Sequence, residues 1–252
     1  MKIEGKNAVK EILDSNLRID KVLVQKDCSA DINALVSKLK KKNVRVEFVQ
    51  KQILDKQSEN GKHQGIIAYA SNYNYAQLDD ILALAQAKNE PVFLLLVDEV
   101  SDPHNLGAII RSAECAGVHG IILPKNRACQ VNDTVIKVST GACFNVMIAQ
   151  VTNLNDCIRD LKKKNIFVYG MEADGNSIYK TNLTGNIALV VGSEGFGISR
   201  LTRDLCDEII SLPLLGKINS LNASNACSIC LYEAVRQRII NKWEFVSNFK
   251  KA

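Results

Sequence analysis

The polar residues that begin the last predicted helix, within "GKINSLNASNACSICLYEAVRQR" (216–238), are the first candidates for chemistry. Ser220, Asn222, Ser224 and Asn225 crowd this helix start, whereas one capping side chain satisfies one exposed backbone N–H. Four short polar side chains therefore exceed what a cap needs. The surplus indicates either a solvated surface or a helix start that holds a ligand.

A second candidate is the glycine-rich stretch "GSEGFGIS" (192–199), which follows an apolar run. Glycines at a strand-to-helix turn let the backbone approach a ligand and leave helix N–H groups facing it. The spacing of Gly192, Gly195 and Gly197 differs from the G-x-G-x-x-G of dinucleotide sites and occurs late in the chain, which excludes a dehydrogenase. The Glu194 carboxylate either interacts favourably with the positive end of a helix dipole or orients a ligand.

The third candidate stretch, 98–118, contains Asn105, which we expect to cap a helix after a turn at "DPHN". Arg111 faces away from the apolar stripe of that helix, because successive residues are rotated by about 100°. It either pairs with Glu114 at i+3 or extends toward a ligand at the carboxyl edge of a sheet. Each of the three stretches follows a predicted strand, so all three can converge at that edge.

Alternating strands and helices from residue 77 onward predict an α/β domain with a mostly parallel sheet. Its strands read as continuous apolar runs, which is typical of strands buried on both faces. We predict strands at 92–100, 120–124, 145–151, 166–172, 186–192 and 208–214, and helices at 77–87, 106–116, 131–138, 154–164, 198–206 and 222–240. A small α/β domain over 1–70, a linker and first helix over 71–90, and the larger domain over 91–245 complete the predicted organisation.

Positive charge is concentrated in the N-terminal part of the 252-residue chain. Residues 1–75 hold 14 Lys and Arg against 9 Asp and Glu, so the whole net charge of +5 lies there. The densest segment is "KLKKKNVR" (38–45). A basic domain joined to a neutral one indicates either a polyanion-binding module or a solvated, lysine-rich helix end.

The eight cysteines lack the spacing of a disulfide scaffold, and the three histidines lack metal-ligand spacing. Cys227 and Cys230 form one CxxC, which we interpret as two small core residues rather than a zinc or redox site. No segment reads as a signal peptide, and the longest apolar runs are too short to span a bilayer. We therefore expect a cytoplasmic protein without a membrane segment or a metal.

Three segments carry a family resemblance: "DPHNLGAIIRSAECAGVHGIILP" (102–124), "ALVVGSEGFGISRL" (188–201) and "ISLPLLGKINSLNASNA" (210–226). In this order they resemble the three motifs of the SpoU/TrmH family in the SPOUT superfamily. "VSTGA" (138–142) is similar to the segment between motifs, and residues 1–70 resemble the family's ribosomal-protein-like substrate-binding domain. The resemblance implies an RNA ribose 2′-O-methyltransferase whose parallel α/β domain ends in a deep trefoil knot.

The resemblance also implies ligands and site residues. These are S-adenosylmethionine as cofactor, a guanosine of 23S-type ribosomal RNA as substrate, and a second copy of the chain in a homodimer that completes each site. Positions matching the family's cofactor-binding residues are Gly192, Glu194, Leu212, Leu221, Asn222 and Ser224. Positions matching its catalytic polar set are Asn105, Arg111, Glu194, Ser220 and Asn222.

Two alternatives stay open beside that substrate. Transfer RNA is the first, although the transfer-RNA enzyme of the family usually lacks the small domain; a non-catalytic RNA-binding protein is the second.

Methyl transfer to a ribose hydroxyl requires positioning and help with deprotonation, since the cofactor supplies the electrophile. The family assigns a general-base role to the position of Arg111, but arginine stays protonated and its fork suits phosphate. We expect Arg111 to clamp a phosphate and stabilise the developing oxyanion.

Overall fold

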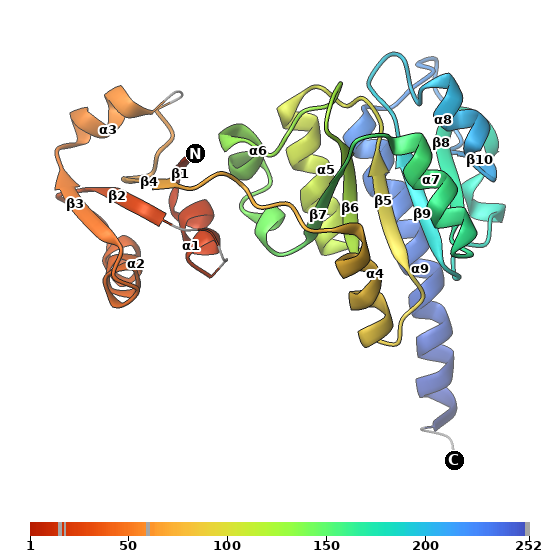
Figure 1. Ribbon diagram of the computed structural model, residues 1–252, viewed down its shortest axis with the longest axis horizontal. Coiled ribbons are helices and arrows are strands. Elements are labelled where there is room, and N and C mark those ends of the chain that lie inside the picture. The colour runs from red at the N-terminus through yellow and green to blue at the C-terminus, as the bar shows by residue number, and fades with distance from the viewer. Residues whose placement is uncertain (15–16, 18, 59–60, 250–252) are drawn as a thin grey trace. The chain divides into compact units, whose positions relative to one another are not determined.

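The computed structural model describes residues 1–14, 17, 19–58 and 61–249, including their side chains except those of 14 and 240–249. Contacts group these residues into two units, whose elements are labelled in Figure 1. The first unit contains Met1–Asn74 and Val131–Asn145. The second contains Tyr75–Gln130 and the chain from Val146 onward.

A four-stranded mixed sheet organises the first unit. Its order is β1-β4-β2-β3, with β4 antiparallel to both neighbours and β3 parallel to β2. The strands are β1 (Lys2–Glu4), β2 (Ile19–Gln25), β3 (Arg45–Val49) and β4 (Ile66–Ala70), and the helices are α1 (Lys6–Asp14), α2 (Ala30–Lys41) and α3 (Lys51–Gln57). Leu23, Leu54 and Ile67 form a buried cluster between β2, α3 and β4. The small α/β domain expected from the sequence is present, with β1 as an additional strand.

A segment from the middle of the chain completes this unit. It contains α6 (Asp133–Val138) and the short 3₁₀ helix η1 (Ala142–Phe144). The Lys2 backbone N–H donates to the Asp133 carboxylate at 2.9 Å, and Lys137 pairs with the buried Glu4 at 3.3 Å. These contacts explain why residues 131–145 group with the N-terminal strands.

Six parallel strands form the sheet of the second unit, in the order β10-β8-β9-β5-β6-β7. They are β5 (Phe93–Val97), β6 (Gly120–Pro124), β7 (Met147–Val151), β8 (Phe167–Ser177), β9 (Ile187–Val191) and β10 (Glu208–Ser211). Every residue of β5, β6 and β9 is buried, which explains their unbroken apolar sequences. The predicted parallel α/β fold is confirmed.

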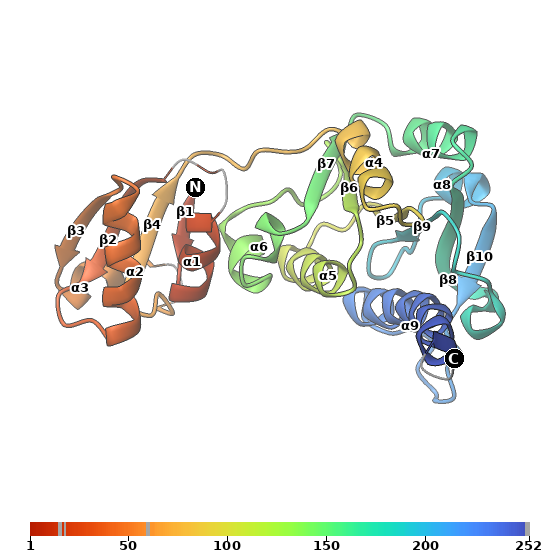
Figure 2. The ribbon, with the colours of Figure 1, turned by 90° about the horizontal axis from the view of Figure 1, so that it is seen from below.

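Helices cover both faces of this sheet. In Figure 2, α4 (Leu78–Ala87) and α7 (Leu154–Lys163) lie on one face, and α5 (Pro103–Cys115) and α9 (Ala223–Phe249) lie on the other. Ile81 of α4 and Ile158 of α7 share a buried core with Leu94 of β5. The neighbouring helices α5 and α9 are joined by a hydrogen bond of 2.7 Å between the hydroxyls of Ser112 and Ser228. The short helices η2 (Ile178–Lys180) and α8 (Arg200–Leu205) follow β8 and β9.

The start of α5 differs from the sequence-based expectation. The helix begins at Pro103, and Asp102 is its N-cap, accepting from the backbone N–H groups of His104 and Asn105. The expected turn over 102–105 and the capping role of Asn105 are therefore wrong. Proline fits the first helical position, and aspartate is a strong cap, so the helix starts three residues earlier than Leu106. The Asn105 side chain is left available for tertiary contacts.

Strand β8 continues past its predicted end because a shift in register interrupts its pairing with β10. The consecutive β10 residues Ile209 and Ile210 face Gly170 and Asn176 of β8. The intervening residues 171–175 have no place in this register and form an irregular segment, which we call the β8 bulge. The sequence predicts a loop from residue 173 onward, since Asp174 and Gly175 favour turns, so the predicted strand ends at 172.

Candidate active site

Asn105, Glu194 and Asn222 form a hydrogen-bonded group that joins the three candidate stretches. Asn105 Nδ2 donates to Glu194 Oε2 at 2.9 Å, and Asn222 Nδ2 donates to the same oxygen at 3.2 Å. Asn222 Nδ2 also lies 3.0 Å from Asn105 Oδ1. We call these side chains the amide–carboxylate cluster. They come from α5, from the loop after β9 and from the start of α9, so tertiary folding brings the three stretches together.

Asn222 has a second function at the start of α9. Its Oδ1 accepts hydrogen bonds from the backbone N–H of Ser224 at 3.0 Å and from the Ser224 hydroxyl at 2.6 Å. The backbone N–H of Asn225 approaches the same oxygen at 3.4 Å. These donors fix the orientation of the amide, so that Nδ2 is directed to Glu194. The polar surplus at this helix start therefore combines a cap with a tertiary contact.

The loop that carries Glu194 depends on glycine. Two backbone hydrogen bonds close it, from Ser193 N–H to Gly197 O at 2.9 Å and from Gly197 N–H to Ser193 O at 3.0 Å. A Cβ on Gly192 would overlap the backbone of Gly197, and Gly197 itself has a φ of +66°. Residues with side chains are strained in both situations. The glycine spacing thus makes a tight, closed loop beside the sheet.

Two carboxylates that were not among the predicted site residues accept hydrogen bonds from the end of this loop. The buried Asp98, directly after β5, accepts from the Ser199 backbone N–H at 2.8 Å. Glu172, in the β8 bulge, accepts from the Ile198 backbone N–H. Sequence reasoning missed both residues. The available signal was their position, since each is an acidic residue within the last three positions of a predicted strand.

A pocket of about 350 Å³ opens beside the glycine loop, within the size range of small-molecule sites. Its walls come from the β8 bulge, the loop 192–197, the loop after β10 and the first turns of α9. The sequence-predicted residues that line it are Gly192, Glu194, Leu212, Ser220 and Leu221. Asn222 and Ser224 are outside the lining and reach it through Glu194. Residues missed by sequence reasoning include Glu172, Phe196 and Asn219.

The lining suits a ligand that combines an apolar ring system with positive charge. Val191, Ile210 and Ala226 supply apolar surface, whereas Glu172 and Glu194 supply carboxylates. The glycine loop adds backbone groups that no side chain covers. S-adenosylmethionine has an adenine ring, a sulfonium and an ammonium group, so the residues present fit this cofactor.

Arg111 is not joined to the amide–carboxylate cluster. It lies six residues after Asn105 on α5, about 240° further around the helix, and its side chain is exposed. Within the described part of the chain it makes no hydrogen bond or ion pair, so the alternative pairing with Glu114 is wrong. Ser220 lines the pocket but likewise forms no side-chain hydrogen bond among the described residues.

The cysteine pair of α9 belongs to the core, as predicted. Cys227 and Cys230 are buried, and Cys230 also contributes to the pocket wall. Burial raises the pKa of the Cys230 thiol to about 12, so it is not a nucleophile near neutral pH. Among the described residues, no group of three or more His, Cys, Asp or Glu side chains is arranged to hold a metal ion. No helix of the described chain is both long and apolar enough to cross a membrane.

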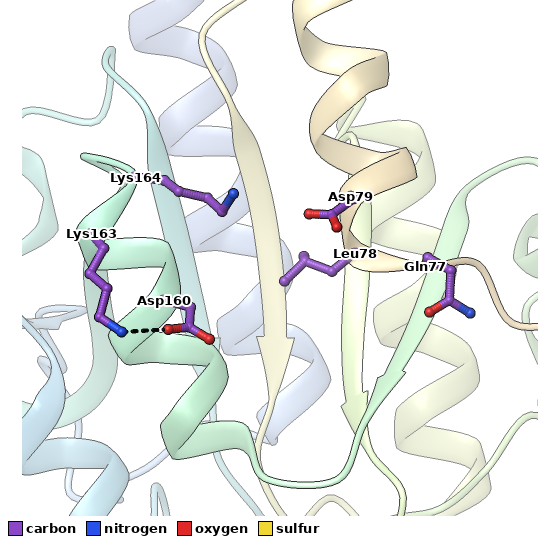
Figure 3. Close-up of a pocket in the computed structure, with 6 residues that line it drawn as sticks. All are labelled: Gln77, Leu78, Asp79, Asp160, Lys163 and Lys164. Atoms are coloured by element: carbon purple, nitrogen blue, oxygen red, sulfur yellow. Dashed lines mark hydrogen bonds and ion pairs between the residues drawn. The ribbon is translucent and has the colours of Figure 1, made fainter.

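A second hollow, of about 510 Å³, lies between α4 and α7 (Figure 3). Four of its six lining residues are charged, and Asp160 and Lys163 already pair there at 2.8 Å. None of the sequence-predicted site residues contributes to it. The sequence-predicted site residues that line a hollow all line the pocket beside the glycine loop.

The fold and this pocket define the class of protein. A parallel α/β sheet carries a cofactor-sized pocket at its carboxyl edge, between a closed glycine loop and a polar helix start, as expected for a methyltransferase with the three motifs. Residues 91–232 match the SpoU rRNA methylase family, and residues 2–76 match the family described as RNA 2′-O ribose methyltransferase substrate binding. The chain belongs to the SpoU rRNA methylase family.

Individual relatives agree with this assignment. The 23S rRNA (guanosine-2′-O-)-methyltransferase RlmB of Escherichia coli K12 is 46% identical over 206 residues, covering 81% of this chain and 84% of its own. RlmB of Photorhabdus laumondii is 44% identical, covering 94% and 98%. The SpoU methyltransferase AviRb of Streptomyces viridochromogenes, solved with AdoMet, has a TM-score of 0.80 at 26% identity, covering 95% and 90%. The predicted family, enzyme class and methyl donor are confirmed.

Proposed function

We propose that this protein methylates the ribose 2′-hydroxyl of a guanosine in 23S-type ribosomal RNA, with S-adenosylmethionine as the methyl donor. The observation that carries the proposal is the amide–carboxylate cluster at the edge of the pocket. The identity to RlmB proteins over most of the chain supports the RNA and the nucleotide. The cytoplasmic location expected from the sequence belongs to the same proposal.

In this proposal the cofactor is held mainly by backbone groups. Gly192, Leu212 and Leu221 line the pocket, and Glu194 lines it with a carboxylate. Asn222 and Ser224 act indirectly. Asn222 donates a hydrogen bond to Glu194, and Ser224 donates one to Asn222, so together they fix the orientation of the carboxylate. Threading of the last loop through another to form the trefoil knot stays a prediction from the family resemblance.

When bound, the cofactor supplies a methyl group on a sulfonium that a ribose oxygen can attack. The protein's contribution is to orient that oxygen and to stabilise its developing charge. Asn105 and Asn222 both donate to Glu194 Oε2. Glu194 Oε1 accepts no hydrogen bond within the described residues and is left to accept one from the ribose hydroxyl. Ser220, in the pocket wall, adds a hydroxyl that can donate a hydrogen bond to the ribose oxygen.

We assign Arg111 to the substrate phosphate. Its guanidinium is exposed and has no carboxylate partner among the described residues, so it can bind a phosphate of the RNA through two parallel hydrogen bonds. Because Arg111 faces away from the cluster of its own chain, the proposal includes a homodimer in which Arg111 completes the partner's site. The exposed apolar residues Ile229 and Tyr232 on α9 support such an interface.

Ribosomal RNA is favoured over the alternatives by the N-terminal domain. Residues 2–76 match a substrate-binding family, and the basic excess of the chain lies in the same residues. A non-catalytic RNA-binding protein is disfavoured because the pocket and the amide–carboxylate cluster are both intact.

The test is transfer of labelled methyl from S-adenosylmethionine to unmodified ribosomal RNA and to transfer RNA, with Arg111→Ala as the control. Label in ribosomal RNA, as a 2′-O-methylguanosine after nuclease digestion, is expected and should be lost in the variant. Label in transfer RNA alone would identify transfer RNA as the substrate instead. Absence of cofactor binding, measured by calorimetry, would contradict the proposal that the protein is a methyltransferase.

A further inference from the structure

Phe196 is an aromatic side chain at the tip of the glycine loop, and 94% of its surface is exposed. It has no ring contact with another aromatic residue of the described chain. Exposure alone does not mark a binding residue, but Phe196 also lines the cofactor-sized pocket, where a free aromatic face can stack on a flat ring of a ligand.

The loop presents this ring on a braced backbone. The two backbone hydrogen bonds between Ser193 and Gly197 close the loop on either side of Phe196. Asp98 and Glu172 then hold the next two backbone N–H groups, those of Ser199 and Ile198. Because the backbone is already ordered, binding through Phe196 does not require the loop itself to be ordered, which favours affinity.

The ring also lies close to the proposed chemistry. Phe196 is two residues from Glu194, and both residues line the pocket. A ribose whose 2′-hydroxyl reaches Glu194 brings its own base, or the base of the adjoining nucleotide, to the mouth of the same pocket. A nucleobase of the RNA therefore comes within reach of Phe196 during the reaction.

We infer that Phe196 is a stacking platform for an unpaired nucleobase of the RNA at the methylated position. This inference rests on the proposed function. Bases in single-stranded loops and bulges stack on aromatic side chains, whereas bases inside a duplex are covered by their neighbours. The substrate class is therefore RNA with the target nucleotide in an unpaired segment, and Phe196 contributes to that selectivity.

The experiment compares Phe196→Ala, Phe196→Leu and Phe196→Trp in the full-length protein. Affinity is measured, without turnover, for an RNA hairpin with an unpaired guanosine in its loop and for a fully paired duplex of the same length. The matched control is Leu215→Ala, because Leu215 is 99% exposed on the neighbouring loop but is not aromatic and does not line the pocket. Calorimetry gives cofactor affinity, and ultracentrifugation gives the oligomeric state.

Loss of one base–aromatic stack is expected to raise the hairpin Kd about tenfold in both the alanine and leucine variants. Tryptophan should retain the affinity, and duplex affinity and cofactor affinity should not change. A raised cofactor Kd would instead assign the ring to the adenine. A dimer that is weakened in Phe196→Ala but restored in Phe196→Leu would assign the ring to the partner subunit. Unchanged hairpin binding in all variants would also overturn the inference.

The outcome is separable from that of the proposed function. If the wild-type protein binds the hairpin through Phe196 but methylates no RNA, the methyltransferase proposal fails while the stacking platform stands. If it methylates ribosomal RNA and Phe196→Ala leaves both hairpin Kd and turnover unchanged, only the stacking platform fails.

Discussion

Asn105 and Glu194, separated by 89 residues in the sequence, share a hydrogen bond of 2.9 Å between an amide donor and a carboxylate oxygen. The pair links α5 to the glycine loop and gives the carboxylate a defined orientation beside the pocket. Asn222 donates to the same oxygen, so two amides converge on one charged acceptor.

Replacing Asn105 by aspartate should damage the site at least as much as replacing it by alanine. The aspartate keeps the shape but puts a second negative charge against Glu194. A lost hydrogen bond to a charged group costs about 1.5–3 kcal/mol, so kcat/KM for RNA should fall roughly 10- to 100-fold. Steady-state methylation kinetics measure this, with His104→Ala, an exposed neighbour on α5, as the control. Near-normal activity of Asn105→Asp would rule out the proposed use of this hydrogen bond.

Arg111→Lys should behave more like Arg111→Ala than like the wild type. Lysine keeps the positive charge but loses the planar fork that binds phosphate through two hydrogen bonds. We expect turnover to fall by about tenfold or more in both variants, with cofactor affinity unchanged. Single-turnover methylation and calorimetry separate these effects. If the lysine variant turned over normally, charge alone would suffice and the geometric role would be wrong.

Glu172→Ala and Asp98→Ala should weaken cofactor binding. Each removes the acceptor for a backbone N–H at the end of the glycine loop, so the pocket wall loses its fixed position. A rise in cofactor Kd of about tenfold is expected, and Glu172→Gln, which retains a carbonyl acceptor but not the charge, should recover part of it. Asp174→Ala is the control within the β8 bulge, since Asp174 pairs with Arg203 and does not line the pocket. Equal effects at Asp174 and Glu172 would indicate general destabilisation of the bulge instead.

His119 should make the protein less stable as the pH falls below neutrality. Burial lowers the pKa of this histidine below its usual 6.5, and nearby Lys88 lowers it further, whereas Glu90 at 3.3 Å opposes the shift. The unfolded chain therefore takes up a proton near pH 6.5 while the folded chain does not, and the free energy of unfolding falls from about pH 7 downward. The fall levels off once the pH passes the folded pKa.

Urea denaturation at pH 7.5, 6.5 and 5.5 measures this dependence. In His119→Asn the side-chain oxygen can still accept the Phe93 backbone N–H, which donates to His119 Nδ1 at 3.1 Å in the wild type. That variant should lose the part of the pH dependence that His119 causes. His104→Asn, at an exposed histidine, should leave the dependence intact. Identical profiles for all three proteins would exclude His119 as the source.

Lysines of the first unit should contribute to RNA affinity through charge. Lys10 and Lys38 line a hollow of about 290 Å³ between α1 and α2. Lys10→Gln and Lys38→Gln should each weaken RNA binding regardless of sequence and reduce the slope of log K against log salt by about 1. Filter binding between 50 and 300 mM salt, roughly the range where phosphate contacts weaken, measures the slope. Lys163→Gln, at the hollow in Figure 3, is the control and should leave it unchanged.

The sequence alone determined the features that depend on neighbouring residues. Buried strands such as β5 and β9 are readable because parallel strands are apolar throughout, and "GSEGFG" is readable as a tight loop because glycine removes the steric limit. The three motifs gave the family for the same reason, since each is a continuous segment.

Features that depend on residues far apart were decided only by tertiary structure. Asn105 reads as a cap, but Asp102 takes that role and leaves Asn105 to bond Glu194. Glu172 reads as the end of a strand, yet it holds the backbone of Ile198 because the β8 bulge carries it to the pocket. Hydrogen bonds of this kind follow from how strands and helices pack, and packing direction is not encoded in any short stretch of sequence.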